Sequence, residues 1–273
     1  MCIMNMLQET ARFGGDLSDE AKLAFGGNAP VLEYGVGAVA VDSLHINGRR
    51  NGRLPHQMQD LMIEFGALTQ ADGSSSVTIG MTQVVASVFG PVSCPLRAQE
   101  HDCAVLQLQL RALPSCASRD QIVSLERILR DALAGCIDMK LFPRALIHMS
   151  VFVLSDDGSV LASAFNAAVC ALLHAKIPMR STPAAATACI SASGDQMVLI
   201  NPDLEEETVA RSVVTVATLG ESLALIHTER EVGDEQLFTL AFEAAVAASK
   251  VTLGCIQRLL RAQVKRDQRL LND

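Results

Sequence analysis

Residues 151–180 of this 273-residue chain read VFVLSDDGSVLASAFNAAVCALLHAKIPMR. The run that ends at Leu154 is rich in β-branched and aromatic residues, which is typical of a strand. The next residues, Ser-Asp-Asp-Gly, predict a turn, after which Ser159 is placed to cap a helix by accepting a hydrogen bond from an early backbone N–H. Residues 160–175 are apolar on nearly every side, which indicates a buried helix. We therefore expect this strand and helix at the centre of a layered structure of sheets and helices.

The composition is compatible with a sizeable core built from small and aliphatic side chains. Hydrophobic residues make up 49% of the chain, but aromatic residues only 4%. The formal net charge is −8, which argues against tight nucleic-acid binding by the chain alone, because such binding needs a basic surface. Local basic patches, or RNA binding shared with partner chains, remain open.

The eight cysteines are scattered and form no C-x-x-C pair. We expect them to be buried, reduced thiols rather than zinc ligands, and we expect neither a metal nor a cofactor. With no signal peptide in the sequence, this pattern favours a reducing compartment. No charge-free apolar run is expected to be long enough to span a membrane.

Strand patterns are followed by helix patterns in each half of the chain. In the first half, strands are expected at 60–67, 75–81, 82–89 and 103–111, with Gly90-Pro91 ending the third, and an amphipathic helix at 119–136. In the second half, strands are expected at 184–191, 196–200, 209–218 and 223–228, followed by a long helix from 233–235 to about 266. This order predicts one α+β domain at 47–270 with two similar halves, and a partly ordered extension at 1–46.

Two charged segments have open interpretations. The segment 48–53, GRRNGR, is expected to be a solvated loop, with contact to a phosphate or a partner as the alternative. Glu205, Glu206 and Glu207 are expected to form a solvated turn, although a carboxylate could act from there. Asp156 and Asp157 are expected to form the turn before the central helix rather than a catalytic pair.

The motifs taken together resemble the ribonuclease PH family. Residues 51–61 (NGRLPHQMQDL), residues 70–91 (QADGSSSVTIGMTQVVASVFGP) and the central stretch follow that family's order of D-G-R, A-D-G-S, G-x-T, G-P and a buried helix. The resemblance covers about residues 47–260. Within the family, the sequence is most similar to the non-catalytic ring subunits of the eukaryotic RNA exosome.

This resemblance implies a fold and an assembly. The fold would be α+β and ribonuclease PH-like, of the type also seen in ribosomal protein S5 domain 2. The chain would be one member of a six-membered ring of three heterodimers, capped by subunits with S1 and KH domains. RNA would thread the channel toward a separate nuclease, in the nucleus, nucleolus and cytoplasm, during RNA processing and degradation, including rRNA processing.

The resemblance also implies where an active site would lie. Active members are phosphorolytic 3′-to-5′ exoribonucleases that hold phosphate where the glycine turn meets the central helix, beside an arginine, and use aspartates of the next hairpin for acid catalysis and metal binding. Here leucine stands at the arginine position and asparagine at the aspartate position, so neither charge is present. The expected degenerate, non-catalytic site comprises Asp157, Gly158, Ser159, Leu161 and Asn201.

RNA contact is more plausible than RNA cleavage. In the family, two loops face the channel, and here they carry Arg97, Arg111 and Arg119, each suited to a phosphate contact that does not read sequence. Two alternatives stay open: an active homodimeric exonuclease, phosphorolytic or using the acidic residues with a metal, and a stand-alone RNA-binding module. The apolar composition also predicts that the isolated chain dimerises or folds poorly alone.

Overall fold

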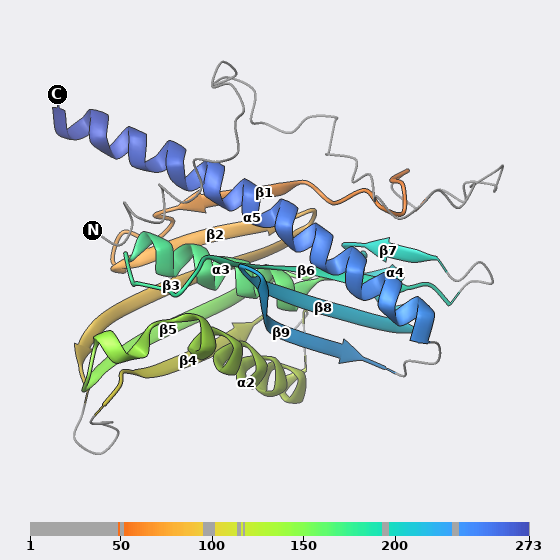
Figure 1. Ribbon diagram of the computed structural model, residues 1–273, viewed down its shortest axis with the longest axis horizontal. Coiled ribbons are helices and arrows are strands. Elements are labelled where there is room, and N and C mark those ends of the chain that lie inside the picture. Colours follow the sequence, from red (N-terminus) through yellow and green to blue (C-terminus); the bar gives the residue numbers. More distant parts are fainter. Residues whose placement is uncertain are drawn as a thin grey trace.

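The computed structural model describes residues 49, 52–94, 102–113, 116, 118–192, 197–230 and 235–272. The expected extension at 1–46 lies outside these residues, and so does Arg97. The described chain forms two β-sheets and the helices that pack between and around them (Figure 1). The expectation of an α+β fold is confirmed.

The first sheet has five strands in the order β1-β2-β3-β5-β4. β1, β2 and β3 form the expected antiparallel meander, β5 pairs with β3 in the antiparallel sense, and β4 lies parallel to β5 at the edge. The bounds are β1 Leu61–Phe65, β2 Gly73–Ile79, β3 Thr82–Ser93, β4 Val105–Ala112 and β5 Ala145–Ser155.

The expected end of the third strand at Gly90-Pro91 is wrong. β3 continues to Ser93 and still pairs with β5 at Val92 and Ser93. A register shift between Phe89 and Val92 accommodates Pro91, which has no N–H to donate to the neighbouring strand. The strand therefore bends past the proline rather than stopping at it.

The central helix α3, Val160–His174, is buried as its composition predicts. Every residue from Leu161 to Leu172 is buried, and the helix packs against β2 and β3 on one side and β6 on the other. The amphipathic helix α2, Arg119–Cys136, has the expected bounds and packs on β4 with one apolar face. A short 3₁₀ turn, Met139–Leu141, leads from α2 into β5.

The second sheet has the order β7-β6-β8-β9 and is antiparallel throughout. Its strands are β6 Pro183–Ile190, β7 Val198–Ile200, β8 Ser212–Leu219 and β9 Ser222–Glu229, with the short helix α4 Leu204–Val209 between β7 and β8. All eight residues of β6, PAAATACI, are buried. These small side chains fit because helices pack on both faces of the strand, α3 on one and α5 on the other.

The last helix, α5, runs from Glu235 to Asn272. Its first part lies on the second sheet through buried small residues such as Ala241, Ala245 and Ala248, and its last turns extend past β1 (Figure 1). Residues 235–266 are long and apolar enough to span a membrane by length and composition alone, but Glu243 and Lys250 lie within this stretch, so it is not a charge-free run. The core packing of the helix accounts for this apolar character.

A buried asparagine joins the two sheets through α3. The side-chain amide of Asn166 donates to the carbonyl of Ala185 (2.9 Å) and accepts from the N–H of the same residue (2.8 Å). Ala185 lies on the part of β6 that β7 does not reach, since β7 pairs only with residues 188–190. The asparagine side chain therefore satisfies the buried backbone N–H and carbonyl of Ala185, which no strand pairs with on that side.

Candidate anion site at the start of the central helix

Three hydrogen bonds hold the turn between β5 and α3. The N–H of Gly158 donates to the carboxylate of Asp156 (3.0 Å). The hydroxyl of Thr82, at the start of β3, accepts from the N–H of Asp157 and donates to the carbonyl of Gly158, both at 2.8 Å. Asp156 thus forms the expected turn, and Thr82 is a further contributor that the sequence analysis did not identify.

The segment 201–204 lies directly against this turn. Gly158 has φ +93°, and a Cβ at this position would lie 2.5 Å from the carbonyl oxygen of Pro202. Glycine is therefore required here both by the backbone conformation and by the close approach of the second chain segment. The space in front of the turn is occupied by the chain itself.

The expected cap of α3 by Ser159 is wrong. Ser159 has φ +55°, and its side chain caps no N–H of the helix. Its hydroxyl donates to the carbonyl of Pro202 (3.4 Å) instead. Its backbone N–H donates to the carboxylate of Glu207 at 2.7 Å. A carboxylate from α4 thus occupies the position in which the start of a helix attracts an anion.

The three glutamates lie in a helix rather than a turn, and only Glu205 is exposed, so the expectation of a solvated turn is wrong for Glu206 and Glu207. They lie in the first turn of α4, where the Glu206 carboxylate accepts from the N–H of Asp203 (2.9 Å). Burial raises the pKa of Glu207 to about 7, even though the hydrogen bond from Ser159 acts in the opposite direction. Burial alone would also raise the pKa of Glu206, but the hydrogen bonds from Arg49 and from the N–H of Asp203, together with the charges of Arg49 and Arg53, outweigh burial and lower the pKa.

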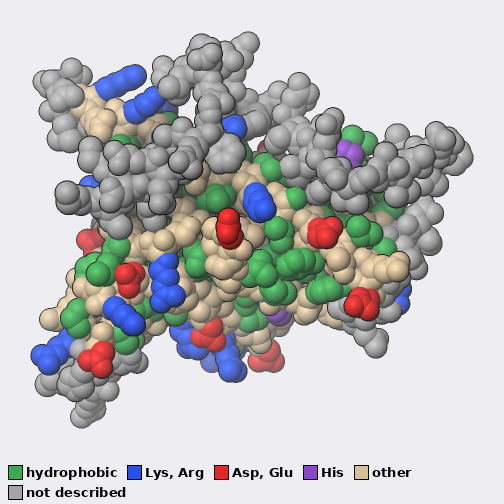
Figure 2. All heavy atoms as spheres, in the orientation of Figure 1, with side chains coloured by type: hydrophobic (Ala, Val, Ile, Leu, Met, Phe, Trp, Pro, Cys, Tyr) green, Lys and Arg blue, Asp and Glu red, His purple; other side chains and the backbone are tan. Residues whose placement is uncertain are grey.

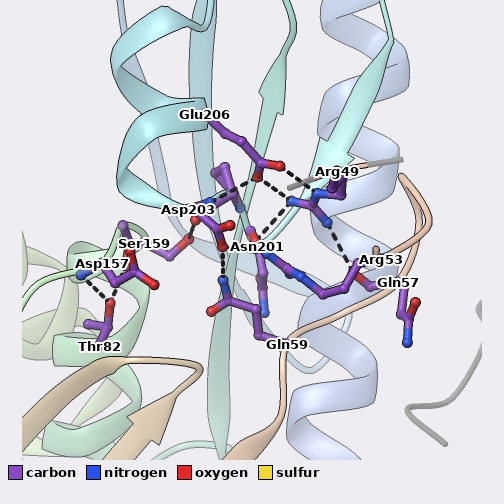
Figure 3. A network of polar contacts seen from close by, with 12 residues as sticks. Arg49, Arg53, Gln57, Gln59, Thr82, Asp157, Ser159, Asn201, Asp203 and Glu206 are labelled. Atoms are coloured by element: carbon purple, nitrogen blue, oxygen red, sulfur yellow. Dashed lines mark hydrogen bonds and ion pairs between the residues drawn. The ribbon is translucent and has the colours of Figure 1, made fainter. Parts of the chain in front are cut away.

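Arg49 connects this corner to the strands of the second sheet (Figure 3). Its guanidinium forms a two-pronged ion pair with Glu206, with N–O distances of 2.9 and 2.7 Å. It also donates to the carbonyls of Gln57 (3.2 Å), Ile200 (2.9 Å) and Asn201 (3.1 Å). Its side chain is only 2% exposed, so its donors are committed to partners within the chain.

Arg53 and Gln59 complete the network. Arg53 forms an ion pair with Asp203 and donates to the carbonyl of Asn201 (3.3 Å), and Gln59 donates to the same aspartate. The expectation of a solvated loop at 48–53 is therefore wrong for Arg49 and Arg53, while Gly48, Arg50 and Asn51 lie outside the described residues.

The two positions that lack the family's charges are both buried. Leu161, in the first turn of α3, is 6% exposed. Asn201 is 3% exposed and has φ +46°, a conformation that asparagine tolerates better than most residues. Its carbonyl accepts from both arginines and its N–H donates to Thr187 (2.9 Å). The structure thus brings Asp157, Gly158, Ser159, Leu161 and Asn201 to the meeting of α3 and α4.

Burial favours the protonated forms of the two aspartates in the turn. Burial raises the pKa of Asp156. Burial, and then the charge of Asp203, raises the pKa of Asp157. Within the described part of the chain, no group of three or more His, Cys, Asp or Glu residues is arranged to hold a metal ion. The described carboxylates of this site are therefore close together but are not arranged to bind a metal ion.

Arg111 and Arg119, the two described arginines that were expected to contact RNA, lie elsewhere. Arg111, at the end of β4, is exposed, and its guanidinium lies 5.8 Å from the ring centre of Phe152. Arg119 is the exposed first residue of α2. Neither arginine takes part in the hydrogen-bond network of Figure 3. These two cations are therefore not part of the site at the start of α3.

Comparisons with known proteins agree with this architecture. Residues 57–178 match the model of the 3′ exoribonuclease family, domain 1, and residues 181–248 match domain 2 of the same family. Exosome complex component Rrp41 of Thermococcus gammatolerans is 29% identical over 182 residues, covering 63% of this chain and 72% of that protein. Rrp41 of Pyrobaculum aerophilum is 34% identical over 143 residues, covering 48% of this chain and 57% of that protein.

Two solved structures share the fold. The crystal structure of rice Rrp46 has a TM-score of 0.71 and 23% sequence identity, with 78% of this chain and 100% of that chain covered. A chain of the Archaeoglobus fulgidus exosome with RNA bound to the active site has a TM-score of 0.67 and 20% identity, with 76% and 92% covered. At these identities the likeness establishes the fold.

Proposed function

This chain belongs to the 3′ exoribonuclease family, and we propose that within the family it is a catalytically silent ring subunit of an RNA exosome. The observation that carries the proposal is the Glu207 carboxylate hydrogen-bonded to Ser159 at the start of α3. A phosphate bound in the manner of active relatives would have to displace this internal carboxyl group. Leu161 stands at the position where active relatives carry the arginine.

The surrounding charges also disfavour phosphorolysis. Incoming phosphate and the RNA phosphodiester are both anionic, so the site must present cations to them. Two arginines of this corner, Arg49 and Arg53, are paired with Glu206 and Asp203. Asn201 supplies an amide where active relatives supply a carboxylate, so it cannot protonate a leaving group.

The proposed partners are other ribonuclease PH-like subunits in a six-membered ring, with S1/KH cap subunits above it and RNA in the channel. The relatives named above are exosome components, which supports this assembly. Exosome component five is the ring position that the central motif resembles most. Arg111 and Arg119 would add phosphate contacts in the channel, and the protein would act in the nucleus, nucleolus and cytoplasm.

The first test is phosphate-dependent degradation of oligo(A) by the purified chain. We expect no release of nucleoside diphosphates. Release that depends on phosphate and disappears in Asp157→Ala would overturn the silent assignment and favour the alternative, an active homodimeric exonuclease.

The second test is recovery of the tagged protein from its own cells, followed by mass spectrometry. We expect other ribonuclease PH-like subunits and S1/KH subunits in amounts comparable to the bait. Recovery of the bait alone, as a homodimer, would contradict the ring assignment.

A further inference from the structure

The end of α5 is a basic region on an otherwise acidic protein. Residues 257–272 contain five Lys or Arg residues and one Asp, a net charge of +4, whereas the whole chain carries −8. Figure 2 shows blue side chains gathered at the projecting end of the helix, at the upper left. The described basic residues there are Arg258, Arg261, Lys265, Arg266 and Arg269.

Four of these cations share one face of the helix. At about 100° per residue, Arg258, Arg261, Lys265 and Arg269 fall within a sector of about 80°, and they extend over about 16 Å of helix. Neighbouring members are three or four residues apart, which brings them within about 6 Å of each other. These separations are shorter than the Debye length of about 10 Å at 0.1 M salt, so the charges act together on a ligand.

These side chains are available to a partner. Arg258, Lys265, Arg266 and Arg269 are all exposed. Among the residues that the structure describes, no acid lies within ion-pair distance of any of these four. By contrast, the exposed Arg127 and Arg130 of α2 both lie beside Asp131.

Compensation of the helix dipole explains only part of this pattern. The dipole acts on charges within the last turn of a helix, and only Arg269 lies in the last turn of α5. The other cations begin at Arg258, about three turns before Arg269. They are therefore not accounted for by the stability of the helix end.

The chemistry of the face favours a phosphate backbone over a protein partner. No large hydrophobic side chain is exposed between 258 and 269 among the residues described. Protein interfaces usually have an apolar or aromatic centre and few lysines. Phosphate contacts, in contrast, are made by exposed Arg and Lys without an apolar centre. We propose that this face of α5 binds the sugar–phosphate backbone of single-stranded RNA without reading its sequence.

The inference rests on the proposed function only for the choice of RNA as the polyanion. It does not depend on whether the corner at α3 is silent, because α5 contributes no residue to that network. If cellular recovery finds no exosome subunits, the proposed function fails while RNA binding by the purified chain is still measured. If RNA binding does not involve α5, this inference alone fails.

The test uses fluorescence anisotropy of labelled oligo(A) and oligo(U) with the full chain, at salt concentrations from about 50 to 200 mM. For Lys265→Gln/Arg269→Gln, we expect weaker binding to both oligonucleotides by the same factor. Each lost phosphate contact on a single strand lowers the slope of log K against log salt by about 0.7, so the double variant should be less steep by about 1.4.

Two controls make the result specific. Arg127→Gln/Arg130→Gln removes the same charge from α2 and should leave the slope within about 0.3 of the unmodified protein. Lys265→Arg/Arg269→Lys keeps the charge and should bind as the unmodified protein does. Far-ultraviolet circular dichroism of each variant verifies that the helix is retained.

Three outcomes would overturn the proposal. The first is an unchanged slope in the α5 variant, and the second is an equal loss in the α2 variant, which would reduce the effect to net charge. The third is normal RNA binding by the α5 variant together with loss of its ring partners, which would identify the face as a protein contact.

Discussion

Charged side chains at the start of α3 are paired within the chain, whereas those at the end of α5 are exposed. At the first place, Arg49 and Arg53 are held by Glu206 and Asp203, and Glu207 accepts from Ser159. At the second place, Lys265 and Arg269 point into solvent with no described acid beside them. The comparison separates charges that hold the fold together from charges that remain available to a ligand, and each variant below tests that separation.

The largest expected effect follows from removing Arg49. Arg49→Met leaves Glu206 partly buried without its arginine partner and removes the guanidinium donors to the carbonyls of Gln57 and Ile200, while the carbonyl of Asn201 keeps only Arg53. We expect the free energy of unfolding to fall by about 3–5 kcal/mol, as for other broken buried ion pairs. Urea unfolding measures the change.

The matched control is Arg127→Met on α2, whose side chain is 80% exposed. It should change stability by less than about 0.5 kcal/mol. Equal effects of the two substitutions would mean that the pairing of Arg49 is no more important than a surface contact.

The next effect concerns an uncharged polar group of the interior. Asn166→Ala leaves both the N–H and the carbonyl of Ala185 without a partner. We expect a loss of about 2–4 kcal/mol, since each buried unsatisfied group costs about 1–3 kcal/mol. Ser163→Ala, which removes only a bond within α3, should cost about 1 kcal/mol or less. A smaller loss for Asn166→Ala than for Ser163→Ala would contradict the bridging role.

A pH dependence distinguishes Glu207 from a surface acid. Its pKa is about 7 in the folded protein and 4.5 for an ordinary glutamate, so the folded state keeps a proton that the unfolded state has lost between these values. Stability contributed by this proton is present below pH 4.5 and is lost as the pH rises to 7. We expect a decrease of roughly 2 kcal/mol across this range, reduced from the fully buried value by partial exposure.

Urea unfolding of Glu207→Gln at a series of pH values checks this. The glutamine keeps an oxygen for Ser159 but does not titrate, so the decrease should be smaller than in the unmodified protein. Asp156 and Asp157, whose pKa values are also raised, would account for the remaining slope. Glu64→Gln, at an exposed position of β1, should leave the slope unchanged.

The smallest effect on stability is expected at the end of α5. Lys265→Gln/Arg269→Gln removes two exposed charges that are not part of an ion pair among the described residues. The free energy of unfolding should change by no more than about 0.5 kcal/mol. A loss as large as that of Arg49→Met would place these cations among the groups that stabilise the fold, and the contrast between the two regions would not hold.

The sequence predicted those parts of the fold that depend on local patterns. Helix α2 has the expected bounds, and the apolar stretch after Ser159 is the buried central helix, because both are recognised from the spacing of apolar residues. The β3 strand was underestimated because a proline usually ends pairing, and a register shift could not be foreseen.

The sequence indicated which residues of the candidate site lie together, but it did not indicate the hydrogen bonds and ion pairs that they form. Asp157, Leu161 and Asn201 do lie at one corner, as the family resemblance implied. The Arg49–Glu206 pair and the Ser159–Glu207 bond were missed because their partners are 157 and 48 residues apart in the chain. The charge of the segment 48–53 was the available signal, but the burial of Arg49 depends on the packing of β7 and α4 around it.

The carboxamide of Asn166 also limits where the second sheet can be extended. By occupying the hydrogen-bonding groups of Ala185, it closes that border of β6 to strand addition from another polypeptide. Another polypeptide could add a strand to this sheet beyond β9, but not at Ala185, and not at Ile200 of β7, whose N–H and carbonyl bond Pro55 and Arg49. One amide inside the core thereby restricts the directions in which neighbouring molecules can continue the sheet.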